Sequence, residues 1–274
     1  MTKIKISPVE IMCYAGSQAI NNGDRVFVGI GYPVVSAALA KKFHAPDCTL
    51  IMEGGIYGIE PFRPPEHIAD LTCSKGAEYC CDFADVFMGI LYKGFIDVGF
   101  LGAGQVDRYG NINSTAVGDY YNPDTRLTGS GGAHEIGSFS QRTVITLTGG
   151  SFLEKVDYVT TPGYLQGYES RYEAGLPEDT GPEYVISTKG VFRFDKTTKE
   201  IYLASYHPGV SIEEIKNDIP WNLQVASDIR VTPLPSAEQL NFMRGFAPTI
   251  SLGSQFSLNV MIRNIMQLMQ ARQN

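Results

Sequence analysis

The chain has 274 residues, of which 43% are hydrophobic, and a net charge of −7 without a cluster of basic residues. This length can form one large domain or two small ones, and the hydrophobic content supports a full core. The negative charge argues against nucleic acid and anionic membrane surfaces as partners.

The cysteines and histidines narrow the chemistry further. Five cysteines, an odd number without a C-x-x-C pattern, predict reduced thiols in a cytoplasmic protein rather than a disulfide framework. The four histidines are scattered, so no metal site is expected. The opening MTKIKISPVE contains no apolar signal segment, and the longest uncharged runs are interrupted by Gly, Pro, Ser, Gln or Asn. A membrane span is therefore not expected.

The first half of the chain alternates helical patterns with short apolar segments. Ser7-Pro8-Val9-Glu10 is typical of a capping box with proline at the first helical position, and predicts a helix that continues to Asn22-Gly23. A second helix is expected at 34–43. Strands are predicted at 25–29, 49–52, 97–101, 142–147 and 155–160. This alternation predicts an α/β fold with a mainly parallel open sheet flanked by helices.

The pattern changes after residue 181. Segments 184–187, 191–194 and 201–204 predict a C-terminal antiparallel meander with turns at 189–190 and 195–198. The tail carries an apolar stripe at helical spacing: Leu258, Met261, Ile262, Ile265, Leu268 and Met269. Such a stripe is more typical of a core or a subunit interface than of a ligand site. We therefore expect one domain at residues 1–235 and a helical extension at 236–274.

The stretch 49–58, TLIMEGGIYG, ends an apolar strand on the carboxylate of Glu53, and Gly54 and Gly55 follow at once. Ligands of parallel α/β sheets gather outside the carboxyl ends of the strands. Glycines leave such a carboxylate sterically open and let a ligand approach the backbone. A solvated surface glutamate is the alternative that this motif alone leaves open.

Two further glycine-rich loops strengthen the prediction of a site. The stretch 100–115, FLGAGQVDRYGNINST, leads a strand into Gly102, Ala103, Gly104 and Gln105. The stretch 128–136, TGSGGAHEI, contains a run whose backbone N–H groups can converge on an oxyanion or a phosphate: Gly131, Gly132 and Ala133. Each loop alone is typical of a simple turn. Three of them together predict a shared pocket.

Taken together, these segments resemble the β subunit of class I, two-subunit CoA-transferases, most closely the glutaconate CoA-transferase branch. The resemblance covers residues 23–205. It rests on several collinear motifs: GDRVFVGIGYPVVSAALAKKFHAPDC, the E-G-G segment, GAGQVDRYGNINSTAVGDY, TRLTGSGGAHEI, KVDYVTTPG and GLPEDTGPEYVISTKGVFRFD.

The resemblance implies a catalytic nucleophile, Glu53, that forms a mixed anhydride and then a glutamyl-CoA thioester in ping-pong catalysis. CoA thioesters would be substrates, with no permanently bound cofactor. The implied oxyanion donors are the amides of Gly131, Gly132 and Ala133, with the 102–105 loop second. Gly54 and Gly55 would shape the entrance for the pantetheine arm. His134 and Glu135 either tune acyl-group choice or form a surface pair.

The resemblance also implies a homologous α subunit as partner, in an α2β2 assembly or a multiple of it, acting on an acyl-CoA and a carboxylic acid. A short dicarboxylic acid such as glutaconate is the expected acyl group. Two alternatives stay open. Hydrolases, including ring-opening ones, and decarboxylases of this branch have an altered glutamate position, so Glu53 favours transfer. The other alternative is a non-catalytic subunit that only binds acyl-CoA.

Overall fold

A computed structural model describes residues 5–68 and 70–250, so the predicted apolar stripe at 258–269 lies outside the described residues. Within this part of the chain ten strands form one sheet. Its strands are β1 (Arg25–Val28), β2 (Thr49–Met52), β3 (Ile56–Tyr57), β4 (Tyr79–Cys80), β5 (Val98–Gly102), β10 (Arg142–Leu147), β12 (Gly181–Ser187), β13 (Gly190–Phe194), β14 (Ile201–Tyr206) and β15 (Gln224–Val231).

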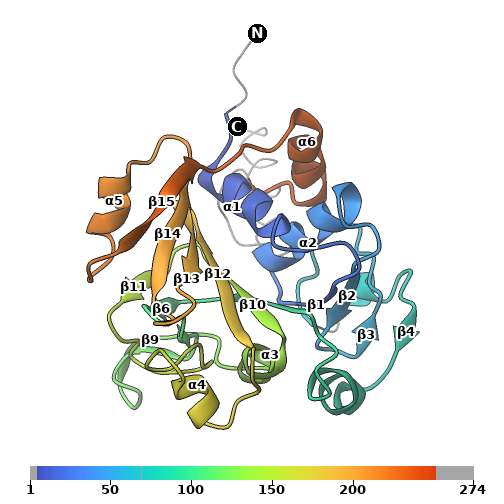
Figure 1. Ribbon diagram of the computed structural model, residues 1–274. Helices are drawn as coiled ribbons and strands as arrows, with labels where there is room; N and C mark the ends of the chain where they lie inside the picture. Colours follow the sequence, from blue (N-terminus) through green and yellow to red (C-terminus); the bar gives the residue numbers. More distant parts are fainter. Residues whose placement is uncertain (1–4, 69, 251–274) are drawn as a thin grey trace, which may run out of the picture.

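The strand order is β15-β14-β13-β12-β10-β5-β1-β2-β3-β4 (Figure 1). The five central strands, from β12 to β2, run parallel, and antiparallel strands follow on both sides. The predicted fold class is confirmed, including the antiparallel meander of β12, β13 and β14. The final strand, β15, returns parallel to β14 and was not predicted.

Helical segments cover both faces of the sheet. One face packs under α1 (Pro8–Ser17), α2 (Tyr32–Phe43) and α6 (Ala237–Phe246). The other carries the π-helix η2 (Asp85–Leu91), α3 (Ala133–Phe139), α5 (Ile212–Asn217) and a small sheet of β6 (Gln105–Asp107), β7 (Ile112–Asn113) and β11 (Ser151–Leu153). The remaining elements are the hairpin β8 (Ala116–Gly118) and β9 (Pro123–Arg126), the 3₁₀ turn η1 (Leu71–Cys73) and α4 (Ser170–Glu173).

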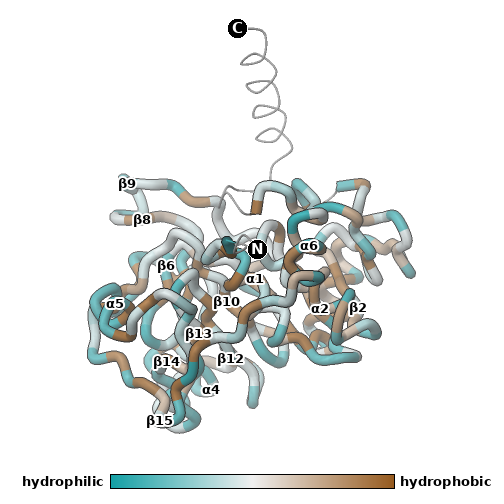
Figure 2. The backbone as a smooth tube through the Cα atoms, turned by 90° about the horizontal axis from the view of Figure 1, so that it is seen from above, coloured by the Kyte–Doolittle hydropathy of each residue, from teal (hydrophilic) through white to brown (hydrophobic). Residues whose placement is uncertain are grey.

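The two cores follow from the alternation of side chains along each strand. Val26 and Val28 of β1 point to the core under α1 and α2, whereas Phe27 points to the opposite core. Leu50 and Ile51 of β2 divide in the same way. Figure 2 shows the apolar segments gathered along α2 and the central strands, with much of the peripheral α5 hydrophilic. Because helices cover both faces of the sheet, a ligand can reach it at the ends of the strands, where the loops lie.

The first helix starts as predicted and ends early. Ser7 Oγ accepts the Glu10 N–H at 3.2 Å, and Glu10 Oε2 accepts the Ser7 N–H at 2.7 Å, which completes the capping box. The helix ends at Ser17 rather than near Asn22-Gly23. There the N–H groups of Ala19 and Ile20 turn to the carbonyls three residues back, so the last turn tightens out of the α-helix.

The strand predicted at 155–160 is wrong, because the strand in this region is β11, which ends at Leu153. The segment that follows is held by a side chain instead. The carboxylate of Asp157 accepts hydrogen bonds from Gln105 Nε2 at 2.7 Å and from the Gly118 N–H at 2.9 Å. Hydrogen bonds from a single side chain leave no periodic pattern in the sequence. The apolar residues near Asp157 were therefore wrongly interpreted as a strand.

The start of the predicted C-terminal extension packs on the main core. Leu240, Met243 and Phe246 of α6 are buried in the core that also contains α1 and α2. Arg244 forms two hydrogen bonds to the buried Glu10, at 2.6 and 3.1 Å, and so ties α6 to α1. The domain boundary at residue 235 stays a prediction. None of the helices in 5–68 and 70–250 is long and apolar enough to cross a membrane.

Candidate active site

Glu53 stands at the carboxyl end of β2, at the head of a tight turn. The chain does not leave the sheet there but folds back within residues 53–55 to form β3. Gly55 has a φ of +86°, and a Cβ atom on it would overlap the carbonyl oxygen of Cys81. The second glycine is thus required by a three-residue hairpin turn and by the close backbone of Cys81, which follows β4. Gly54 is exposed next to the carboxylate.

The glycine loop before α3 meets this carboxylate. The Gly132 N–H donates a hydrogen bond to Glu53 Oε1 at 3.1 Å, across 79 residues of sequence. Gly132 is buried, and a Cβ atom on it would lie 2.5 Å from Phe87 Cζ and 3.2 Å from Glu53 Cδ. A Cβ atom on the neighbouring Gly131 would lie 3.6 Å from Glu53 Oε1. Only a backbone without side chains can approach the carboxylate so closely.

The surroundings make Glu53 more basic than an ordinary glutamate. Burial raises the pKa of its carboxyl group, the negative charge of Glu135 raises it further, and the hydrogen bond from Gly132 opposes both. Within the described residues no lysine or arginine forms an ion pair with Glu53. The result is a half-buried carboxylate with a raised proton affinity, which favours nucleophilic attack.

An apolar wall next to Gly132 is formed by Phe87 of η2 together with Phe83, which precedes this helix. Phe87 packs edge-on against Phe27 with a centroid distance of 5.5 Å and stacks on Phe83 at 4.3 Å. No helix was predicted for this segment. The apolar residues Phe83, Phe87 and Leu91, spaced by four, were the signal that could have found a helix there.

The hydrogen-bonding groups of the 102–105 loop are used within the fold. The Ala103 N–H donates to Thr146 O and the Gly104 N–H donates to Asn113 O, both at 3.0 Å. The side chain of Gln105 is buried between Asp157 and Asn113, and Gly102 is the exposed last residue of β5. Among the described residues no hydrogen bond joins this loop to Glu53. The sequence grouped it with Glu53, whereas the direct contact comes from Gly132.

The remaining members of the predicted loops have separate roles. The Ala133 N–H donates to Ser130 O at 2.9 Å, which closes the turn before α3. The exposed His134 places its Nδ1 3.2 Å from Thr160 O. Glu135 lies half-buried in the first turn of α3, on the side where its charge acts on Glu53. The structure therefore links one of the two flanking polar residues to the carboxylate electrostatically.

The polar residues of the DRYGNIN segment build the loop rather than line a cavity. Asn111 Nδ2 donates to Asp107 Oδ2 and to Leu165 O, both at 2.8 Å. Asn113 Oδ1 accepts the N–H groups of Thr115 and Ala116 at 2.9 and 3.2 Å. Buried amides that are fully paired in this way fix a backbone and leave nothing to offer a ligand.

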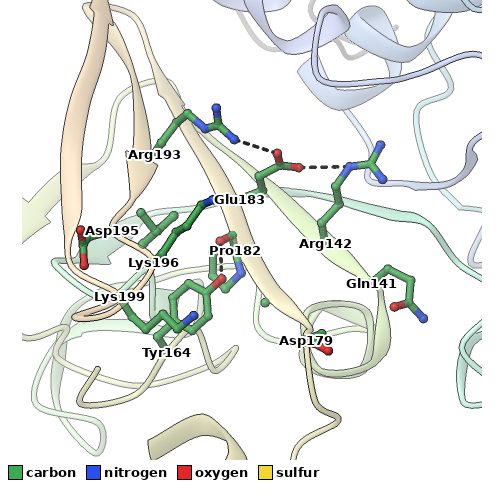
Figure 3. A pocket seen from close by; sticks show the side chains of 12 residues that line it. Gln141, Arg142, Tyr164, Asp179, Pro182, Glu183, Arg193, Asp195, Lys196 and Lys199 are labelled. Atoms are coloured by element: carbon green, nitrogen blue, oxygen red, sulfur yellow. Dashed lines mark hydrogen bonds and ion pairs between the residues drawn. The ribbon is translucent and has the colours of Figure 1, made fainter. Parts of the chain in front are cut away.

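A pocket of about 250 Å³ lies at the opposite edge of the sheet (Figure 3). It is lined by residues at the start of β10 and β12, including Arg142 and Pro182, and by the β13–β14 turn with Lys196 and Lys199. Glu183 bridges Arg142 and Arg193 across its upper part, as Figure 3 shows. Since parallel strands place Glu53 at their carboxyl ends, this pocket is not part of the Glu53 site.

Comparison with known proteins gives consistent matches over most of the chain. The family model described as "Coenzyme A transferase" matches residues 9–218. The β subunit of glutaconate CoA-transferase from Acidaminococcus fermentans is 38% identical over 241 residues, covering 84% of this chain and 89% of the relative. The β subunit of 3-oxoadipate CoA-transferase from Pseudomonas knackmussii is 36% identical over 237 residues, covering 86% and 91%.

Solved structures agree with these matches. The crystal structure of glutaconate CoA-transferase from Acidaminococcus fermentans superposes with a TM-score of 0.81 at 33% identity, covering 89% of this chain and 95% of that chain. The decarboxylase AibA/AibB superposes with a TM-score of 0.74 at 25% identity, covering 89% and 96%.

Proposed function

The chain belongs to the coenzyme A transferase family, and from this premise we propose that it is the β subunit of an enzyme that moves CoA from an acyl-CoA to a free carboxylate. The observation that carries the proposal is the Glu53 carboxylate, held half-buried at the carboxyl edge of the sheet by the Gly132 N–H at 3.1 Å. Glu53 is the nucleophile in this proposal.

The first half-reaction starts with attack of a Glu53 carboxylate oxygen on the thioester carbonyl carbon. The C–S bond breaks, CoA leaves as a thiolate, and a mixed anhydride joins Glu53 to the acyl group. The thiolate then attacks Cδ of Glu53, and the acyl group leaves as a free carboxylate. A glutamyl-CoA thioester remains. No proton moves in either displacement, so the site needs no general acid or base.

The Gly132 N–H has a specific role in the second displacement. When the thiolate attacks Cδ, negative charge develops on a carboxyl oxygen of Glu53 itself. A donor that already lies 3.1 Å from Oε1 stabilises that charge without rearrangement. Gly131 and Ala133 hold the loop around it. The 102–105 loop was the second predicted donor group, but the N–H groups of Ala103 and Gly104 already donate to Thr146 O and Asn113 O, so we assign it no donor role in this step.

The second half-reaction reverses these displacements with a different acid. Its carboxylate attacks Cδ of the glutamyl thioester and releases the thiolate, which then attacks the new acyl carbonyl carbon and frees Glu53. Both intermediates, the anhydride and the thioester, react with water. The apolar wall of Phe83 and Phe87 therefore protects these intermediates as well as shaping the site. Gly54, exposed beside Glu53, leaves room for the narrow pantetheine arm.

The names of the two curated relatives guide the choice of acyl group. Glutaconate and 3-oxoadipate are both short dicarboxylic acids. We propose that this enzyme also uses a short dicarboxylic acyl-CoA. Both relatives are β subunits, so a homologous α subunit is the proposed partner, in an α2β2 assembly or a multiple of it. The purified chain alone is then expected to be inactive, which activity and light-scattering measurements check together.

The test of the mechanism is covalent trapping at Glu53. The co-expressed α and β chains are incubated with glutaconyl-CoA, reduced with borohydride and digested for mass spectrometry. We expect the peptide with Glu53 to carry the corresponding alcohol, and Glu53→Ala to abolish both the adduct and CoA exchange. An adduct on another residue would remove Glu53 from its proposed role.

The same assay separates the alternatives. A hydrolase or a decarboxylase, such as the solved AibA/AibB, consumes acyl-CoA in the absence of an acceptor acid. A transferase requires the acceptor and conserves the thioester. A non-catalytic binding subunit would leave exchange unchanged in Glu53→Ala. Each outcome contradicts a different part of the proposal.

A further inference from the structure

Arg171 of α4 is a buried cation without a buried anion beside it. Its residue is 4% exposed, and within residues 5–68 and 70–250 no carboxylate lies within hydrogen-bonding distance of its guanidinium. Burial lowers the pKa of this group to about 10, so it stays protonated at neutral pH. Burying a charge without a counter-ion costs free energy, which hydrogen bonds to the charged group must offset.

The guanidinium joins two separate backbone segments and the side chain of Thr180. Nη2 donates to Gly137 O at 3.0 Å and Ser138 O at 2.9 Å, which are carbonyls of the last turn of α3. Nη1 donates to Pro162 O at 3.1 Å and Gly163 O at 2.9 Å. Nε and Nη2 donate to the hydroxyl of Thr180. Because the acceptors diverge, only a planar fork with five N–H groups can reach all of them.

The helix held in this way is the one that presents Gly132 to Glu53. It has seven residues, too few to be stable by itself. Its first turn is also tied to this region by His134, whose Nδ1 lies 3.2 Å from Thr160 O. In its middle, a Cβ atom on Gly137 would overlap Thr161 Cγ2, so α3 lies directly on the segment that Arg171 also binds.

We propose that Arg171 is a positioning residue for the reaction: it locks α3 against the 160–163 segment and thereby sets the Gly132 N–H on the Glu53 carboxylate. The expected effect of Arg171 on catalysis rests on the proposed function, whereas its expected effect on the hydrogen bond at Glu53 does not. Arg171 touches neither Glu53 nor Gly132, and its effect travels along α3. Loss of the fork lets α3 shift, and the hydrogen bond at the carboxylate lengthens first.

The test compares Arg171→Lys with Arg244→Lys in the co-expressed enzyme. Arg244 also makes several hydrogen bonds, to Glu10 and to Lys5 O, but it contacts α1 rather than α3. We expect Arg171→Lys to lower kcat at least about tenfold with KM for acyl-CoA changed less than about threefold. Arg244→Lys is expected to lower the melting temperature and to leave both kinetic constants within about twofold.

A second readout does not depend on turnover. The pKa of Glu53 is measured by ¹³C NMR of carboxyl-labelled glutamate, with the Glu53→Gln spectrum identifying the signal. Loss of the Gly132 hydrogen bond, which lowers the Glu53 pKa in the wild type, should raise that pKa further in Arg171→Lys. It should stay unchanged in Arg244→Lys. If the wild-type enzyme transfers no CoA, the proposed function fails, and this titration still decides the role of Arg171.

A milder variant covers the case in which Arg171→Lys does not fold. Thr180→Val keeps the shape of the side chain and removes one acceptor of the guanidinium. We expect shifts of kcat and of the Glu53 pKa in the same directions but smaller. A folded variant of either kind with a wild-type Glu53 pKa overturns the proposal.

Discussion

The ion pairs at the amino ends of the central strands (the amino edge) contrast with the isolated Glu53 carboxylate at their carboxyl ends (the carboxyl edge). At the amino edge, charges are paired: Arg25 Nε lies 2.9 Å from Asp97 Oδ2, and Arg142 binds both Asp24 and Glu183. At the carboxyl edge, Glu53 receives one backbone N–H and is otherwise left with the like charge of Glu135. The pKa of Asp97 is lowered despite burial, because Arg25 binds the carboxylate, whereas the pKa of Glu53 is raised.

This difference separates stability from chemistry within one sheet. Paired charges at the amino edge favour the ionised state that the folded protein contains, so they stabilise it at neutral pH. The isolated carboxylate at the carboxyl edge is ionised at a cost, which is typical of functional sites. Changes at Glu53 and at the backbone donor beside it should therefore alter turnover, whereas changes at the ion pairs of the amino edge should alter stability.

Short of removing the Glu53 carboxylate itself, the largest effect is expected from Gly132→Ala. Its Cβ atom would lie 2.5 Å from Phe87 Cζ. Because Phe87 is buried against Phe27 and Phe83, the loop must move and carries the N–H away from Glu53. Turnover should fall about 100-fold or more, the usual loss for a missing oxyanion donor. Steady-state kinetics of the co-expressed enzyme measure it.

Gly16→Ala is the matched control on the face covered by α1. Its Cβ atom would lie 2.7 Å from Ser36 Oγ and 3.0 Å from Phe100 Cζ, a comparable overlap remote from the site. It should reduce stability by about 1–3 kcal/mol and leave turnover unchanged. Equal turnover losses in the two variants would mean that Gly132 acts through packing alone.

A second effect concerns acid sensitivity. His207 follows β14 at the carboxyl edge, is 1% exposed and hydrogen-bonds to Ser187 O and Thr232 Oγ1. Burial lowers its pKa to about 4 from 6.5. Between pH 6.5 and pH 4, His207 is therefore protonated in the unfolded chain and neutral in the folded chain. The free energy of unfolding falls as the pH falls through this range. The loss should reach about 2–3 kcal/mol.

Urea unfolding at pH 7 and pH 4.5 tests this in the wild type and in His207→Gln. The variant cannot take up the proton, so its loss between the two pH values should be smaller by about 2 kcal/mol. The ion pairs of the amino edge fail at lower pH, because the pKa of Asp97 lies below its usual value. Identical pH dependences would show that His207 is not the group that titrates.

The amino edge itself is tested by Arg142→Met. Removal of this guanidinium leaves Asp24 without its arginine and leaves Glu183 with Arg193 alone. Because these side chains are partly exposed, we expect a loss of about 1–3 kcal/mol in the free energy of unfolding. CoA transfer should stay within about twofold of the wild type. A large loss of turnover at unchanged stability would contradict the division between the edges.

Local patterns were enough to predict much of the carboxyl edge. The strand at 49–52 coincides with β2, and the strand at 142–147 coincides with β10, because both are apolar runs bounded by turn residues. Glu53 was identified as the nucleophile through its place after such a strand together with the family resemblance. That role stays a prediction, although the contact with Gly132 supports it.

Long-range packing could not be predicted in this way. The sequence ranked the amides of Gly131, Gly132 and Ala133 together, but which N–H faces Glu53 depends on how α3 sits on η2 and on Arg171. Arg171 itself stands in an ordinary polar segment. Apart from the Thr180 hydroxyl, its acceptors are backbone carbonyls, which have no sequence signature. The hairpin after Glu53 was missed because Gly55 was interpreted as room for a ligand, whereas it serves the turn.

The smallest expected effect, and the most direct test of the comparison, is a gain of stability in Glu53→Gln. The pKa of Glu53 is raised in the folded protein, so ionisation opposes folding at neutral pH. The sign is therefore opposite to that of Asp97: the penalty is present above the folded pKa and vanishes as pH falls below the unfolded value of 4.5.

A neutral glutamine at position 53 still accepts the Gly132 N–H, so the melting temperature of Glu53→Gln at pH 8 should be about 1–3 °C higher than that of the wild type. The difference should shrink toward zero near pH 4.5, and His207 cancels because both proteins contain it. Glu178→Gln, at an exposed carboxylate, is the control and should change little at either pH. A Glu53→Gln protein that is less stable than the wild type at pH 8 would show that this carboxylate stabilises the fold, as the paired charges of the amino edge do.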